Sequence, residues 1–119
     1  MEKETLFQNK VKADLEALPY TFVIKIQQQA LRGDPDLVVC IGGRAVYLEL
    51  KKDEKSKADA LQLYRLHKAR KANALAFVVW PEIWGELLDY LEELASWPIS
   101  QKELPKCLRS HMAGLETQS

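Results

Sequence analysis

The chain has 119 residues, of which 47% are hydrophobic, and it carries 17 Lys and Arg residues against 17 Asp and Glu residues. This length predicts one domain with its own core and excludes two. A formal net charge of zero excludes a uniformly basic surface as the basis of nucleic-acid binding. No apolar stretch approaches a membrane span and the N-terminus has no apolar signal core, so we expect a soluble, cytoplasmic protein without membrane contact.

Periodicity and turn residues divide the chain into helices and strands. Apolar residues at helical spacing end at Pro19, and Pro81 is suited to the first turn of a later helix. Gly42-Gly43 between two apolar runs is typical of a two-residue hairpin with positive φ at both positions. In chain order the pattern predicts a helix at 2–18, a strand at 20–26, hairpin strands at 36–41 and 44–51, a helix at 58–71, a strand at 74–80 and a helix at 82–95.

This order predicts an α/β fold with a mixed central sheet and helices on both sides. The hairpin is antiparallel, whereas a strand, helix and strand in succession imply a parallel, right-handed crossover. Within the helix at 58–71, we expect Ala58, Leu61, Leu66 and Ala69 to face inward. Residues 1–98 are expected to form the domain. Residues 99–119 are expected to form an extension in which Ser100 and Glu103 have the spacing of a capping box before a short helix and a frayed tail.

The hairpin register places two acidic residues opposite each other. If Ile41 pairs with Arg44, then Leu37 faces Leu48 and Asp36 faces Glu49. Alternation puts the apolar residues of both strands on a core face, while Tyr47, Glu49 and Lys51 share the other face with Asp36. A bulge of one residue would move Asp36 to the core face.

Facing carboxylates indicate a cation. Like charges on directly opposed residues are destabilising unless a positive charge lies between them, and Mg²⁺ prefers carboxylate oxygens completed by water or phosphate. Lys51 follows on the same face, within reach of a phosphate or an attacking water. An ordinary solvated strand face explains Asp36, Glu49 and Lys51 equally well when they are considered alone.

Charge is unevenly distributed along the chain. Basic residues dominate 51–71, whereas 72–101 has no Lys or Arg and carries five acidic residues. Two solvated helix faces would produce the same pattern. Cys40 and Cys107 lie far apart and are expected to be free thiols, and with His67 and His111 they show none of the close ligand spacings of zinc sites.

The elements together resemble a known superfamily. A helix with Glu4, Asp36 at the start of one hairpin strand, Glu49-x-Lys51 at the end of the next and a later helix with Gln62 resemble the PD-(D/E)xK nucleases. The string GDPDLVVCIGGRAVYLELKK, followed by Gln62 and then AFVV, looks like the small stand-alone VRR-NUC domains common in bacteriophages. The resemblance covers roughly residues 4–79.

The resemblance implies roles for individual residues. Asp36 and Glu49 would hold Mg²⁺ or Mn²⁺ with the backbone carbonyl of Leu50, and Lys51 would be the catalytic lysine. Gln62 would be the family's helical glutamine, and Glu4, or its neighbour Glu2, the acid of the first helix, with Gln8 a family-typical companion. Asp34 departs from the apolar residue usual before Pro35, and either coordinates through water or caps the loop. The basic residues expected to hold nucleic acid are Lys25, Lys52, Lys55, Lys57, Arg65 and Lys68.

The implied activity is metal-dependent hydrolysis of DNA phosphodiester bonds. One or two bound ions activate water and polarise the phosphate in such sites, and no side-chain nucleophile is needed. The resemblance to Holliday junction resolvases implies cleavage of branched DNA by a homodimer in a bacterial or phage-infected cell. Three alternatives are a nicking or restriction-like nuclease, a non-catalytic nucleic-acid-binding module on the same fold, and an interaction protein that uses Trp84, Trp97 and the acidic helix as its partner surface.

Overall fold

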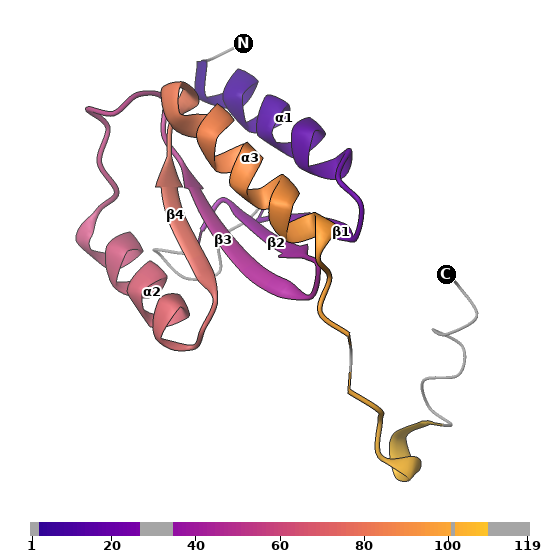
Figure 1. Cartoon of the computed structure of the whole chain (residues 1–119). Helices are drawn as coiled ribbons and strands as arrows, with labels where there is room; N and C mark the ends of the chain where they lie inside the picture. Colours follow the sequence, from indigo (N-terminus) through magenta and orange to yellow (C-terminus); the bar gives the residue numbers. More distant parts are fainter. Residues whose placement is uncertain (1–2, 27–34, 101, 110–119) are drawn as a thin grey trace.

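The computed structural model describes residues 3–26, 35–100 and 102–109 and confirms the predicted α/β class (Figure 1). Three helices and a four-stranded sheet make up the body of this part of the chain. The elements are α1 (Lys3–Glu16), β1 (Thr21–Lys25), β2 (Leu37–Ile41), β3 (Arg44–Leu50), α2 (Ala60–Lys71), β4 (Leu75–Val79) and α3 (Pro81–Ser96). Each predicted element is present within two residues of its expected bounds.

The sheet is mixed, with its strands in the order β1-β2-β3-β4. β1 with β2 and β2 with β3 are antiparallel, and β3 with β4 is parallel. The parallel pair arises because α2 lies between β3 and β4 in the chain and returns it to the same end of the sheet. The predicted mixture of antiparallel hairpin and parallel crossover is therefore confirmed.

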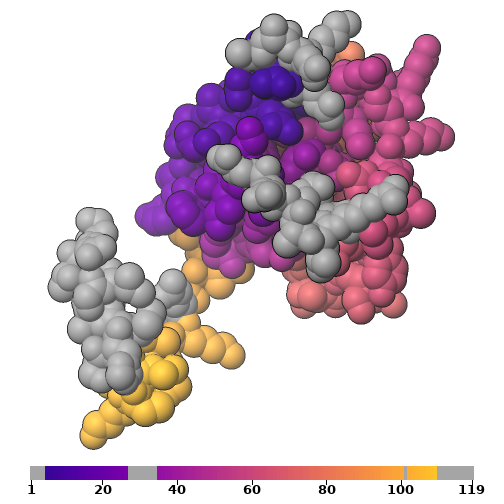
Figure 2. Space-filling view, turned by 180° about the vertical axis from the view of Figure 1, so that it is seen from behind, coloured from indigo at the N-terminus to yellow at the C-terminus, as the bar shows by residue number. Residues whose placement is uncertain are grey.

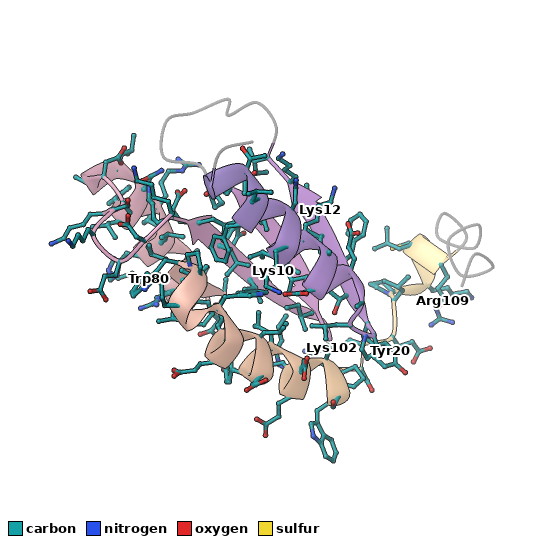
Figure 3. All side chains as sticks on the ribbon, turned by 90° about the horizontal axis from the view of Figure 1, so that it is seen from above. Lys10, Lys12, Tyr20, Trp80, Lys102 and Arg109 are labelled. Atoms are coloured by element: carbon teal, nitrogen blue, oxygen red, sulfur yellow. The ribbon has the colours of Figure 1, made fainter. Side chains whose placement is uncertain are left out.

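One face of the sheet forms the core against α1 and α3 (Figures 1 and 3). Trp84 links the two helices, because its ring packs edge-on against Phe7 and its Nε1 donates a 2.8 Å hydrogen bond to Asp14 Oδ2. Trp84 is therefore buried, which is contrary to the surface role considered for it. The core is made by Phe7, Val11 and Leu15 of α1, by Trp84, Leu91 and Ala95 of α3, and by Leu37, Val39, Ile41, Val46, Leu48, Leu50 and Val79 of the sheet.

α2 lies on the opposite face, beside β3 and β4. Leu66 is its buried residue, whereas Leu61 is 39% exposed, so the expectation that Leu61 faces inward was wrong. The helix begins at Ala60 because Asp59 accepts a 2.8 Å hydrogen bond from the backbone N–H of Gln62. α2 is amphipathic only in part. In Figure 2 the pink surface of the α2 region lies beside the violet surface of the N-terminal elements.

The hairpin register is the predicted one. Ile41 pairs with Arg44 and Leu37 with Leu48, without a bulge. Gly42 and Gly43 have φ of +57° and +85°, values at which glycine avoids the strain of a side chain. A Cβ on Gly42 would also lie 2.8 Å from the carbonyl oxygen of Leu94, so the turn packs directly on the end of α3.

Arg44 completes the end of α3. The helix has no basic residue in its last turn, and Arg44 Nη1 donates to the carbonyls of Leu94 and Trp97 at 3.2 and 3.0 Å. A cation at this end interacts favourably with the helix dipole. The hairpin that carries the candidate site is thus fixed to the core at its turn.

Beyond α3 the chain leaves the body of the domain (Figures 1 and 3). Residues 106–109 form one helical turn after Pro105, so the expected capping box of Ser100 and Glu103 does not begin it. Glu103 instead forms a 3.1 Å ion pair with Arg109. The expected free thiols are confirmed for Cys40 and Cys107. In the described ranges, none of the helices has the length and apolar character needed to cross a membrane.

Candidate active site

Asp36 stands where β2 begins, at the end of the sheet remote from the turn. Its carbonyl accepts a 2.9 Å hydrogen bond from the backbone N–H of Ile26. Its Oδ2 accepts a 2.7 Å hydrogen bond from the backbone N–H of Leu50. The first bond fixes the backbone of Asp36, and the second holds its side chain across the end of β3 through one of its two carboxylate oxygens.

Glu49 lies on the same side of the sheet as Asp36. Continuing the observed register by one residue beyond Leu37 and Leu48 places the two acidic residues opposite each other, as predicted. Glu49 is 2% exposed, and among the described residues it is the only charged side chain that is buried. Burying a carboxylate is costly unless positive charge or hydrogen bonds compensate it, so this position favours a cation nearby.

The donors at this point fit a hard divalent cation. The N–H of Leu50 points toward Asp36, and the carbonyl of a strand residue lies on the same side of the strand as its N–H. Two carboxylates and one backbone carbonyl are ligands of the kind that Mg²⁺ or Mn²⁺ combines with water and substrate phosphate. Nowhere in the described ranges do three His, Cys, Asp or Glu residues gather into a metal site. The side chain of Glu4, and Glu2 and Asp34, lie outside the described residues.

Lys51 and Gln62 meet beside the carboxylates. Lys51 follows β3, anchored by a 2.9 Å hydrogen bond from its backbone N–H to the carbonyl of Val79. Its Nζ lies 3.5 Å from Gln62 Oε1. The same oxygen accepts a 2.9 Å hydrogen bond from the backbone N–H of Asp59, as part of the capping box of α2. The glutamine therefore ties the start of α2 to the lysine.

The loop between β3 and α2 is ordered by Asp53. Its Oδ1 accepts hydrogen bonds from the backbone N–H groups of Lys55 and Ser56, both at 2.9 Å, and from Ser56 Oγ at 3.1 Å. The backbone hydrogen bond from Ser56 is the main reason that the pKa of Asp53 is lowered. This turn lies between the end of β3 and Asp59, the residue that caps α2.

The basic residues predicted to hold nucleic acid fall into three groups. Lys25 ends β1, where it pairs with Leu37, next to Asp36. Arg65 and Lys68 lie on α2. The loop after β3 carries Lys52, Lys55 and Lys57, all exposed. Because Leu37 is a core residue, the register puts Lys25 on the core side of the sheet, at the same end as Asp36 but not on its face. Lys55 lines a separate hollow with Trp80 and Glu82, whereas Arg65 and Lys68 line the groove described next.

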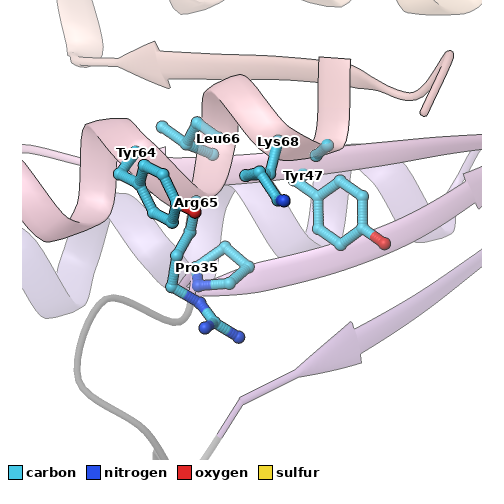
Figure 4. A pocket seen from close by; sticks show the side chains of 7 residues that line it. Pro35, Tyr47, Tyr64, Arg65, Leu66 and Lys68 are labelled. Carbon is cyan, nitrogen blue, oxygen red and sulfur yellow. The ribbon is translucent and has the colours of Figure 1, made fainter. Parts of the chain in front are cut away.

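A groove adjoins the carboxylates, and no role was predicted for the aromatic residues in it. It has a volume of about 340 Å³ and is lined by Pro35, by Tyr47 of β3, and by Tyr64, Arg65, Leu66, Lys68 and Ala69 of α2. In Figure 4 the ring of Pro35 lies between Arg65 and Tyr47. Tyr47 shares the strand face of Glu49, a signal from which its place beside the site could have been predicted. The position of Tyr64 depends on the packing of α2, which periodicity did not fix.

Known proteins provide one informative comparison. A solved structure described as a VRR_NUC domain is 35% identical to this chain, with a TM-score of 0.64. The match covers 78% of this chain and 97% of that one. The scan of protein-family models and the search of curated proteins gave no match. The resemblance drawn from the motif residues and the similarity of the whole fold therefore agree.

Proposed function

Because this chain belongs to the VRR-NUC family, whose fold is of nuclease type, we propose that it is a divalent-metal-dependent endonuclease that hydrolyses phosphodiester bonds in DNA. One observation carries the proposal. Asp36, Glu49, Lys51 and Gln62, which come from three different elements, converge at one end of the sheet with Glu49 buried. A solvated strand face does not require such burial.

Each residue has a task that its contacts support. Asp36 and Glu49, with the carbonyl of Leu50, would hold Mg²⁺ or Mn²⁺. Bound there, the ion would lower the pKa of a water molecule and neutralise charge on the phosphate. Asp36 is kept in its orientation by the N–H of Leu50. Its fixed carboxylate reduces the reorganisation needed when substrate arrives.

Lys51 is the positively charged side chain that the protein itself, as distinct from the metal ion, contributes to the site. Gln62 Oε1, which has no formal charge, accepts from its ammonium at 3.5 Å and so holds Lys51 without forming an ion pair with it. Held there, the ammonium orients an attacking water or stabilises the charge that accumulates as the phosphoryl oxygen is attacked. Because this hydrogen-bond donor is held in place before the reaction begins, it stabilises the developing charge most effectively.

The substrate is DNA, bound through its backbone. Lys25, the loop lysines and the basic side of α2 offer phosphate contacts, and such contacts position a duplex without reading its sequence. We infer selectivity for DNA shape, as in branched junctions. Symmetric cutting of two strands would require a homodimer. A nicking or restriction-like nuclease would use the same site on another substrate.

The experiment is a digestion of labelled junction, flap, single-stranded and duplex DNA, side by side, with Mg²⁺, with Mn²⁺ and with a chelator. We expect metal-dependent cleavage that is fastest on a branched substrate. Equal rates on all substrates would support the nicking or restriction-like alternative. Binding without cleavage under every metal condition would refute the nuclease and leave the binding module.

A further inference from the structure

The groove beside the carboxylates combines two aromatic rings with two cationic side chains. Tyr64 is 56% exposed, and Lys68 Nζ lies 5.9 Å from the centre of its ring. Tyr47 and Pro35 also line the groove, and in Figure 4 Tyr47 and Tyr64 lie on either side of Pro35. The aromatic and apolar surfaces provide contact area, while Arg65 and Lys68 place positive charge at the same opening.

Three chain segments connect this groove to the candidate active site. Pro35 directly precedes Asp36, and Tyr47 lies two residues before Glu49 on the same strand face, about 7 Å away. Along α2, Arg65 follows Gln62 by three residues and therefore lies on the same side of the helix. A ligand in the groove would be about one nucleotide away from a phosphate held at Asp36 and Glu49.

The composition of the groove matches a nucleotide whose base is unstacked. Base faces stack on aromatic side chains in proteins that bind single strands, while basic side chains follow the backbone. In a duplex those faces are covered by neighbouring bases, and exposing one costs a few kcal/mol. A volume of about 340 Å³ is at the small end of the range for ligand sites, which suits one nucleoside.

We propose that the groove between Tyr47 and Tyr64 binds a single unstacked nucleotide next to the cleaved phosphate, with Arg65 and Lys68 on its backbone. The site then selects DNA that already has a single-stranded segment at the cut, such as a flap, a fork or a distorted junction. The groove's place in cleavage rests on the proposed nuclease function. Its affinity for a single strand does not.

The test compares variants of Tyr64 in binding. Full-length protein is titrated, in chelator so that no DNA is cut, against a short fluorescein-labelled single strand and the matching duplex. We expect Tyr64→Leu to weaken single-strand binding about tenfold, the effect of one lost stacking partner, and to leave duplex binding unchanged. Tyr64→Phe keeps the ring and should retain the wild-type affinity for the single strand. The matched control is Tyr90→Leu, which removes an exposed tyrosine from α3.

A second measurement locates the base. A fluorescent adenine analogue, whose emission falls when it stacks on a ring, is placed at successive positions of the strand. Wild-type protein and Tyr64→Phe should quench one position, and Tyr64→Leu should not. Equal losses for Tyr64→Leu and Tyr90→Leu, or equal losses on single strand and duplex, would overturn the groove assignment.

The outcomes for the groove and for the nuclease are separable. If wild-type protein cuts no DNA but Tyr64 still governs single-strand affinity, the nuclease proposal fails and the groove stands. If cleavage depends on Glu49 but neither binding nor substrate preference changes in Tyr64→Leu, the groove proposal fails alone.

Discussion

The substitution Glu49→Gln distinguishes between two possible roles of Glu49, as a metal ligand or as a structural residue. Glutamine keeps the shape of the side chain and removes its charge. Glu49 is 2% exposed and stands one register step beyond the last paired residues, opposite Asp36. Directly opposed residues have Cβ atoms about 5 Å apart, and two ionised carboxylates at that spacing repel by about 3 kcal/mol at an effective dielectric constant near 20.

The substitution should therefore act differently with and without metal. In chelator, the substitution relieves a repulsion of up to about 3 kcal/mol from Asp36, which should offset the contacts that Glu49 loses, so the free energy of unfolding of Glu49→Gln should stay close to that of wild type. With Mn²⁺ at about 100 times its dissociation constant, wild-type protein should gain about 2.7 kcal/mol. At about 4 °C per kcal/mol, this is a rise in Tm of about 10 °C, which the variant should lose.

Thermal melting by circular dichroism, with and without Mn²⁺, measures both effects. Glu92→Gln, which removes an exposed acid from α3, is the matched control and should behave as wild type in both conditions. The reasoning is refuted if Glu49→Gln keeps the full Mn²⁺ shift. It is also refuted if the variant melts well below wild type in chelator, because the contacts of Glu49 would then outweigh its repulsion from Asp36.

Three further predictions follow from particular contacts. Gln62→Ala should lower stability by about 1 kcal/mol, because it removes the side-chain half of the capping box, and should slow cleavage by releasing Lys51. Gln62→Glu should keep that half of the box. Urea unfolding and cleavage rates measure the two effects, and unchanged values in Gln62→Ala would contradict both. Lys68→Gln should reduce the slope of log affinity for DNA against log salt concentration by about 1, and the control Lys10→Gln on α1 should leave that slope unchanged. If the two variants have the same slope, Lys68 does not contact the DNA. Trp84→Phe should lower stability by about 1–3 kcal/mol through its lost hydrogen bond without changing the cleavage rate of folded protein, and a slower rate would connect the α1–α3 contact to the site.

Most of the fold could be predicted because local signals agree with tertiary packing. The glycine pair fixes the hairpin turn, the turn fixes the register, and the register determines which residues are buried. The helix at Ala60–Lys71 was the weaker case. Its apolar residues do not form one clean stripe, so periodicity placed Leu61 inward, whereas packing on a sheet face that is partly open leaves it exposed.

The candidate site likewise contains residues whose positions could be predicted from the sequence and residues whose positions could not. Residues tied to the hairpin register, Asp36, Glu49 and Lys51, lie where counting from the turn puts them. Gln62 reaches Lys51 because the helix cap fixes its side chain. The two residues are eleven positions apart in the chain, and this spacing alone does not specify their contact. Tyr64 lines the groove only because of how α2 rests on β3 and β4, which is a tertiary fact without a local signal.

The central claim is that the carboxylates at the end of the hairpin carry out metal-dependent DNA cleavage. Its most direct test is the single-turnover cleavage rate of the fastest-cut substrate in Mg²⁺ for wild type, Glu49→Gln and Glu92→Gln. We expect wild type and Glu92→Gln to cut at the same rate and only in the absence of chelator, and Glu49→Gln to be slower by about 1000-fold. Undiminished cleavage by Glu49→Gln, or cleavage by wild type in chelator, would contradict the account.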